Sequence, residues 1–66
     1  MRTNPAKFEL ALARSGLMIQ EVAKKAGVHR GTVLNMKRGG GSRPDTLGRV
    51  AKALGVDVES IVAPKS

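Results

Sequence analysis

Residues 19–38 read IQEVAKKAGVHRGTVLNMKR, and this stretch decides the fold. Apolar residues at helical spacing lie on both sides of Gly27, which indicates two short helices with a turn between them. Gly27 allows the left-handed turn conformation that a Cβ disfavours. Ala23 provides the small side chain that two helices need where they cross at a steep angle. Val33 and Met36 bury the inner face of the second helix, so we expect its outer face to lie in solvent.

Further helices are expected on both sides of this stretch. The first begins after a cap at Thr3 or Asn4 and stops at Gly16. No segment alternates apolar and polar residues as a half-buried strand does. The expected fold class is therefore all-α, with five short helices. They cover residues 5–15, 19–26, 29 or 30 to 37, 44–54 and 57–62.

The start of the helix at 44–54 has two interpretations. Ser42 and Asp45 have the spacing of a capping box, in which each side chain accepts a hydrogen bond from the other residue's backbone N–H. Alternatively, Arg43 is the cap and Pro44 takes the first helical position, where its missing N–H is harmless. Both interpretations leave residues 39–42 as a flexible, glycine-rich loop.

The size and composition of the chain allow one small domain, residues 1–66, and residues 63–66 are expected to fray. Hydrophobic residues make up 41% of the chain, which is enough for a folded core. The sequence has no Cys and a single His, so no metal site is expected. It also has no paired carboxylates at a useful spacing, no nucleophile with its base and no phosphate-binding loop. We therefore expect no enzyme, no cofactor and no small-molecule ligand.

Positive charge dominates the sequence, because twelve Lys and Arg face five Asp and Glu and give a net charge of +7. Such a chain suits a polyanionic partner, most often nucleic acid. The segment from Val22 to Pro44 contains no acidic residue, and its basic residues are Lys24, Lys25, Arg30, Lys37, Arg38 and Arg43. No apolar run approaches the roughly 18 residues of a membrane span, and no secretory signal is evident. We therefore expect a cytoplasmic protein of bacterial or phage type.

Several short motifs occur in a fixed order along residues 8–62. They are Gly16-Leu17, Glu21 to Val28, Thr32-Val33, Arg38-Gly39, Thr46-Leu47 and Val50 to Val56. In this order and spacing they resemble the lambda-repressor-like family of helix-turn-helix regulators, which includes Cro, C1 and Xre-type proteins. The resemblance implies a helix-turn-helix at residues 19–38, formed by the second and third of the five helices.

The resemblance also implies how the protein docks on DNA. The third helix would enter the major groove with its N-terminus first, while the second helix lies across the backbone. Arg30 is the expected guanine reader, and Asn35 is expected to read adenine or to bind a phosphate. The expected base-reading residues are Arg30, Gly31, Thr32, Leu34 and Asn35. Phosphate contacts are expected from His29, Lys37, Arg38, Gly39, Gly40 and Arg43, and from the backbone of Met18 and Ile19.

Two departures from the family pattern bear on these contacts. Many relatives have Thr or Ser followed by Gln where this chain has Met18 and Ile19, so only backbone N–H groups remain there to hold a phosphate. Many relatives also pair an Arg of the first helix with a Glu near the end of the third, where this chain has Leu12 and Lys37. We expect Leu12 to fill that space with apolar contact and Lys37 to turn toward DNA or solvent.

Two functions are compatible with this sequence. The first is a sequence-specific regulator of transcription, such as a repressor, that acts as a homodimer on a palindromic site in double-stranded DNA. The candidates for its dimer interface are Val58, Ile61 and Val62, in the last helix. The alternative is a protein-interaction module on the same fold, such as an anti-repressor or an antitoxin-like subunit. Exposed apolar side chains at Met18, Ile19 and Leu34 would favour this alternative.

Overall fold

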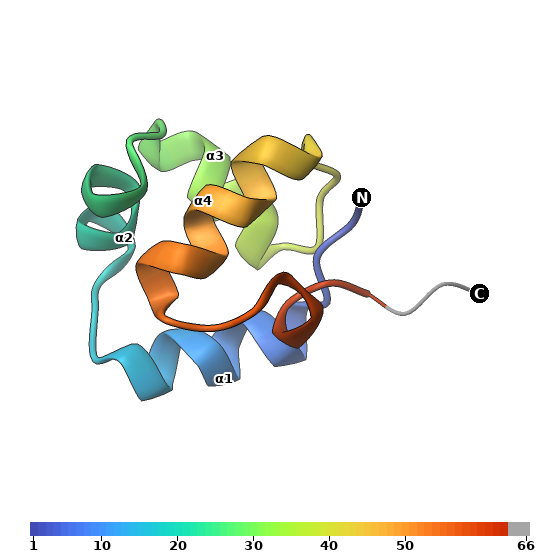
Figure 1. Ribbon diagram of the computed structural model, residues 1–66, viewed down its shortest axis with the longest axis horizontal. Coiled ribbons are helices and arrows are strands. Elements are labelled where there is room, and N and C mark those ends of the chain that lie inside the picture. Colours follow the sequence, from blue (N-terminus) through green and yellow to red (C-terminus); the bar gives the residue numbers. More distant parts are fainter. Residues whose placement is uncertain (64–66) are drawn as a thin grey trace.

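The computed structural model describes residues 1–63, and Figure 1 shows how its helices are arranged. The described part contains four α-helices and one 3-10 turn. These are α1 (Pro5–Ser15), α2 (Ile19–Ala26), α3 (Arg30–Lys37), α4 (Pro44–Leu54) and η1 (Val58–Ser60). Within these residues β-pairing is limited to two isolated bridges, Arg2 with Gly41 and Thr3 with Val62. The predicted all-α class and the first four predicted helices are confirmed.

The fifth helix, expected over 57–62, is wrong, because only the single 3-10 turn η1 forms there. Beyond this turn the chain pairs with the N-terminal segment. The backbone carbonyl of Ile61 accepts a hydrogen bond from the Asn4 N–H at 2.9 Å, and Val62 forms an antiparallel bridge with Thr3. This long-range pairing uses backbone groups that a further helical turn would need.

The same pairing extends to the expected frayed tail. The Ala63 N–H donates a hydrogen bond to the Arg2 carbonyl at 2.8 Å, so the first residue of that tail has a backbone partner. The other residues of that tail, 64–66, lie outside the described part of the chain.

Local signals at the helix ends explain where α1 and α4 begin. Asn4 is the cap of α1, and its Oδ1 accepts a hydrogen bond from the Lys7 N–H at 3.1 Å. At α4 the capping box of Ser42 and Asp45 is wrong, because Arg43 is the cap and Pro44 is the first helical residue. A residue before proline is disfavoured in the helical conformation. Arg43 accordingly has an extended backbone, with φ −71° and ψ 148°, so the helix cannot begin before Pro44.

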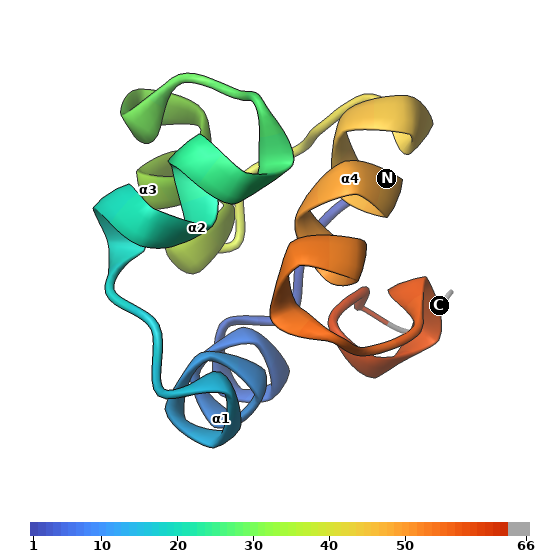
Figure 2. The same cartoon turned by 60° about the vertical axis from the view of Figure 1, so that its left-hand side comes forward.

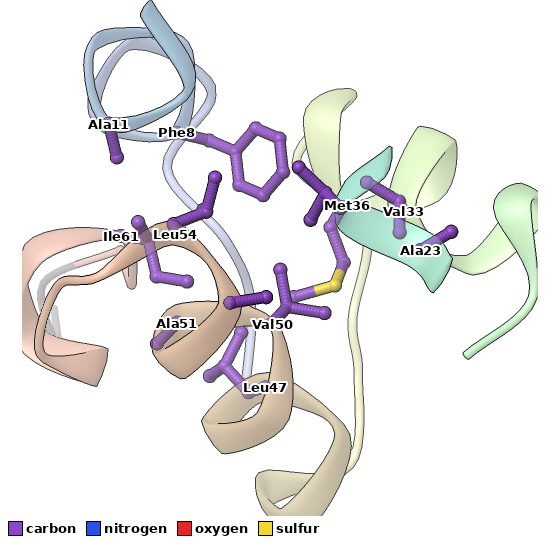
Figure 3. Packing of buried hydrophobic residues seen from close by; sticks show 12 residues of the cluster. Phe8, Ala11, Ala23, Val33, Met36, Leu47, Val50, Ala51, Leu54 and Ile61 are labelled. Carbon is purple, nitrogen blue, oxygen red and sulfur yellow. The ribbon is translucent and has the colours of Figure 1, made fainter. Parts of the chain in front are cut away.

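The core lies between α4 and the elements that pack around it, with α1 on one side and α2 on another (Figures 1 and 2). Figure 3 shows Phe8 pointing from α1 into the space between α3 and α4. The expected apolar role of Leu12 is confirmed, because this side chain packs partly buried against the core. The fully buried hydrophobic residues are Phe8, Val22, Val33, Met36, Leu47, Val50 and Ile61.

One buried group within the described residues is poorly matched to its surroundings. The Thr3 residue is only 2% exposed, and its hydroxyl oxygen, Oγ1, is buried without a hydrogen-bond partner. An unpaired buried polar group costs about 1–3 kcal/mol, because it gives up its hydrogen bonds to water and receives none in return. The Thr3 side chain therefore lowers the stability of the segment that joins the N-terminus to Val62.

Replacing Thr3 with Val, which keeps the shape and removes the hydroxyl, is expected to stabilise the protein by about 1 kcal/mol. For a domain of this size that corresponds to a rise in the melting temperature of roughly 4–8 °C. Thermal unfolding followed by circular dichroism measures the change. The control is Thr3→Ser, which keeps the hydroxyl and is expected to lower the melting temperature. A Thr3→Val protein that melts at or below the temperature of the parent would contradict the prediction.

Candidate nucleic-acid interface

The turn between α2 and α3 determines which face of α3 is exposed. Gly27 ends α2 with φ 71° and ψ 33°, the left-handed conformation expected from the sequence. The Val28 N–H then donates a hydrogen bond to the Ala23 carbonyl at 3.0 Å, which closes the turn. Val33 and Met36 on α3 are fully buried, so the opposite face of this helix is directed away from the core.

His29 holds the first turn of α3 in place. It is the cap residue, and its Nδ1 atom accepts a hydrogen bond from the Gly31 N–H at 3.0 Å. In the neutral ring, an accepting Nδ1 leaves the proton on Nε2, which can then donate to an anion. The cap therefore both fixes the exposed end of α3 and leaves one donor available at that end.

The expected base-reading residues do not all have equal access to a ligand. Arg30 and Gly31 are exposed at the first turn of α3, whereas Thr32 and Leu34 are half-buried. Asn35 is exposed, but its side-chain Nδ2 donates a hydrogen bond to the Gly41 carbonyl at 3.2 Å. The structure thus presents Arg30 freely, while it engages Asn35 with the loop after α3.

An open groove runs beside α3 and separates it from the start of α4. Its volume is about 550 Å³. The wall on the side of α3 is formed by His29, Gly31, Thr32 and Asn35, and the opposite wall by Gly41, Ser42, Arg43 and Thr46. Residues of α3 and its cap therefore lie across one groove from the end of the glycine loop and the start of α4, with polar side chains on both sides.

Sequence reasoning missed two groove residues, Ser42 and Thr46. From the sequence, Ser42 is expected only as a helix cap, and Thr46 belongs only to one of the short motifs. Both carry hydroxyl groups that can donate to a phosphate oxygen. Arg43 is the sequence signal that points to them. Ser42 precedes it directly and Thr46 lies in the first turn of α4 just after it, so both are expected near any phosphate that Arg43 binds.

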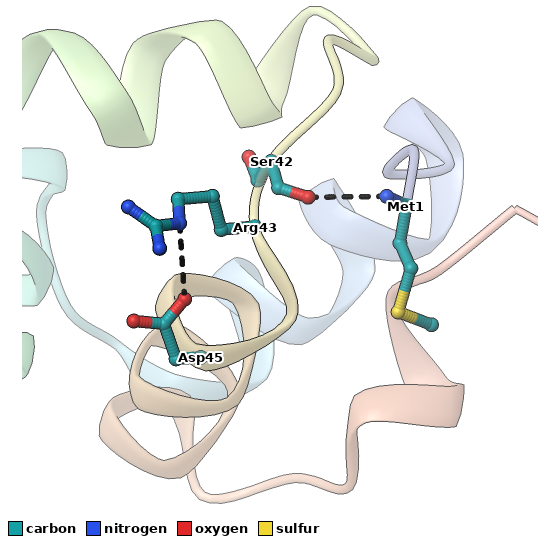
Figure 4. Close-up of polar contacts among 4 residues, drawn as sticks. All are labelled: Met1, Ser42, Arg43 and Asp45. Atoms are coloured by element: carbon teal, nitrogen blue, oxygen red, sulfur yellow. Dashed lines mark hydrogen bonds and ion pairs between the residues drawn. The ribbon is translucent and has the colours of Figure 1, made fainter.

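Of the cations expected at phosphates, Arg43 lines this groove, whereas Lys37 and Arg38 lie at the end of α3 outside its lining. Arg43 forms the only ion pair among residues 1–63, with 3.8 Å between its Nε atom and Oδ1 of Asp45 (Figure 4). The two side chains are 86% and 65% exposed, and an exposed pair of this length contributes little stability. Arg43 can therefore exchange Asp45 for a phosphate at small cost. Arg38 is exposed just after α3, and Lys37, Gly39 and Gly40 are half-buried.

The start of α2 differs from what a phosphate site requires. The Met18 N–H donates a hydrogen bond to Oε1 of Glu21 at 2.9 Å. A carboxylate therefore already uses this donor and places negative charge there. The Met18 side chain is 64% exposed, whereas Ile19 is half-buried and packs against the core. Of the expected phosphate contacts, those at Met18 and Ile19 have the least support from the geometry.

The expected dimer residues also differ in access. Ile61 is fully buried in the core, whereas Val58 and Val62 are half-buried and pack against it. Within the described residues there is no cluster of three or more side chains suited to a metal ion. The described helices are all too short and too polar to cross a lipid bilayer.

The comparisons with known proteins agree with this geometry. A family model described as helix-turn-helix matches residues 9–61, which extend from α1 to the residue after η1. No curated protein matches the chain.

Proposed function

The chain belongs to the Cro/C1-type helix-turn-helix family of DNA-binding regulators, and from this premise we propose that it regulates transcription by reading the DNA major groove with α3. The first turn of α3 would contact base edges, and the residues around the groove beside it would contact the backbone. Base contacts give specificity, and phosphate contacts fix the register of the protein on the duplex.

The observation that carries the proposal is the position of Arg30. Its side chain is exposed at the first turn of α3, beside a groove whose far wall is formed by the start of α4. A guanidinium in this place can donate two hydrogen bonds to O6 and N7 of a guanine. Thr32 is half-buried on the same helix, and a Thr methyl group is suited to contact a thymine methyl.

Phosphate contacts are assigned to side chains on both sides of Arg30. On the far wall of the groove these are Ser42, Arg43 and Thr46, and on the near wall it is His29. At the end of α3, outside the groove lining, they are Lys37 and Arg38. If about six phosphates are engaged, the logarithm of the binding constant falls with the logarithm of the salt concentration with a slope near −5.

We further propose that the protein binds as a homodimer, because members of this class of fold read palindromic sites with two copies. Val58 and Val62 are the candidate contacts that keep exposed surface, while Ile61 serves the core. Val58 also lines a groove between α4 and η1, next to Gly55 and Val56. A second copy that packs there would cover apolar surface at the end of α4.

Selection of bound sequences from a random pool of DNA duplexes tests the proposal. We expect enrichment of one motif with two inverted halves, and a salt dependence close to the slope given above. Enrichment of a single half-site would support base reading but contradict the homodimer. The absence of any enrichment at moderate salt would contradict the proposed function.

The alternative, a protein-interaction module, has one observation in its favour. Met18 exposes 64% of its surface at the start of α2, where a phosphate contact has little support. However, Ile19 and Leu34, the other apolar residues expected to serve a protein partner, are half-buried. The apolar surface is thus smaller than this alternative expected, and the acid-free basic segment favours DNA.

A further inference from the structure

We propose that Asn35 is a positioning residue and not a base reader: its side chain locks the glycine loop, residues 39–42, in the shape that carries Ser42 and Arg43 to the DNA backbone. This inference rests on the proposed function. It concerns the affinity for DNA and not the choice of base, because neither Asn35 nor the loop has to touch a base in order to position Ser42 and Arg43.

The sequence of the glycine loop does not favour any single backbone conformation. Three consecutive glycines have more accessible backbone conformations than any other residues, so fixing them costs more entropy. Gly39 has φ 88°, which lets the chain leave α3 and turn back toward the N-terminal segment. Contacts from outside the loop must therefore fix the conformation of residues 40–42.

Asn35 supplies these contacts from the side of α3. Its Nδ2 atom donates a hydrogen bond to the Gly41 carbonyl at 3.2 Å, and its backbone carbonyl accepts one from the Gly40 N–H at 2.9 Å. The side-chain amide also lies directly against Gly40, where a Cβ would overlap with it. The amide plane is thus fixed by the loop, whereas bidentate reading of adenine requires that plane to face the base edge.

The N-terminal segment holds the loop from the opposite side. Ser42 donates its N–H to the Met1 carbonyl at 2.8 Å and accepts a hydrogen bond from the Met1 nitrogen at 3.1 Å (Figure 4). Thr3 donates its N–H to the Gly40 carbonyl at a longer 3.4 Å. The loop therefore lies between Asn35 and residues 1–3, with a hydrogen bond to each side.

This lock lowers the cost of binding. A loop that is already ordered does not lose conformational entropy when it meets its ligand, so less of the contact energy is lost. Ser42 and Arg43 follow the locked glycines directly and line the groove across from Asn35. Without the Asn35 side chain, Ser42 and Arg43 would still be able to contact a phosphate, but their positions would no longer be fixed.

The experiment compares Asn35→Ala with the parent on two duplexes, the sequence selected from the random pool and an unrelated one of equal length. We expect the variant to bind both about fivefold more weakly, the effect of one hydrogen bond, with an unchanged ratio between the two affinities. A base reader behaves differently, because its loss weakens binding to the selected duplex and relaxes the preference at one base pair. That second result would overturn the proposal, and so would unchanged affinity for both duplexes.

A double-variant cycle with Gly40 adds a specific signature. Gly40→Ala alone is expected to weaken DNA binding, because the added Cβ collides with the Asn35 amide. The backbone at Gly40 does not have a positive φ, so its conformation is one that Ala adopts. In the Asn35→Ala background the collision is gone and the methyl group stiffens the loop, so Gly40→Ala is expected to restore part of the lost affinity. Equal, additive losses in both backgrounds would overturn the proposal.

Two controls separate this lock from the fold and from the proposed function. Gly48→Ala, at a site in α4 where a Cβ meets nothing within 4 Å, is expected to change affinity equally in both backgrounds. Amide hydrogen exchange without DNA is expected to accelerate at Gly40 and Ser42 in Asn35→Ala, with the amides of α4 unchanged. If the parent protein bound no duplex, the proposed function would fail, while faster exchange at these two amides would still support the lock. Unchanged exchange at both amides would overturn the lock itself.

Discussion

Replacing Phe8 with Ala is expected to remove about 3–5 kcal/mol of stability, a large part of what keeps this domain folded. Phe8 is the only aromatic residue of the chain, and its side chain is fully buried between α1, α3 and α4 (Figure 3). Removal of a buried Phe side chain costs about 3–5 kcal/mol, through lost transfer energy and the cavity left behind. A domain of this size has a total stability of roughly 3–10 kcal/mol. The loss is therefore comparable with the whole stability of the fold.

Urea denaturation followed by circular dichroism measures this effect. The matched control is Leu10→Ala, because Leu10 lies on the same helix but is 54% exposed, and its midpoint is expected to stay close to that of the parent. Phe8→Leu keeps most of the buried volume and is expected to give an intermediate midpoint. An unchanged midpoint for Phe8→Ala would show that the core does not depend on this ring.

The features that the sequence predicted correctly have local causes. The ends of α1 and α2 follow from Gly16 and Gly27, which adopt the left-handed conformation that stops a helix. The exposed face of α3 follows from the buried positions of Val33 and Met36 on the other side. Each of these signals acts within a few residues, so the pattern of the chain is enough to find it.

The features that the sequence missed depend on residues far apart in the chain. The expected last helix does not form, because Val62 pairs with Thr3, which lies nearly the full length of the chain away in the sequence. The role of Asn35 depends on where the glycine loop returns, and that position depends in turn on residues 1–3. Glycines carry no side chain that could reveal such contacts in advance, so the sequence alone predicts only a flexible loop.

Arg30→Ala is expected to weaken binding to the selected duplex by about 5–150-fold, the range for loss of a bidentate contact to guanine. The preference for one base pair in each half-site should also relax, because the side chain that distinguishes it is gone. The fold should be unaffected, since Arg30 is exposed and has no ion-pair partner among residues 1–63. Competition binding at fixed salt, with duplexes that vary one base pair at a time, measures both effects.

The control for Arg30→Ala is Arg14→Ala, which removes one positive charge from an exposed position on α1, outside both the groove beside α3 and the groove next to Val58. Loss of charge alone weakens binding to every duplex by a similar factor and makes the salt slope less steep. If both variants lost affinity equally and kept the same base preference, Arg30 would act as a charge and not as a reader. If Arg30→Ala changed neither affinity nor preference while the protein stayed folded, the protein-interaction function would be favoured over DNA reading.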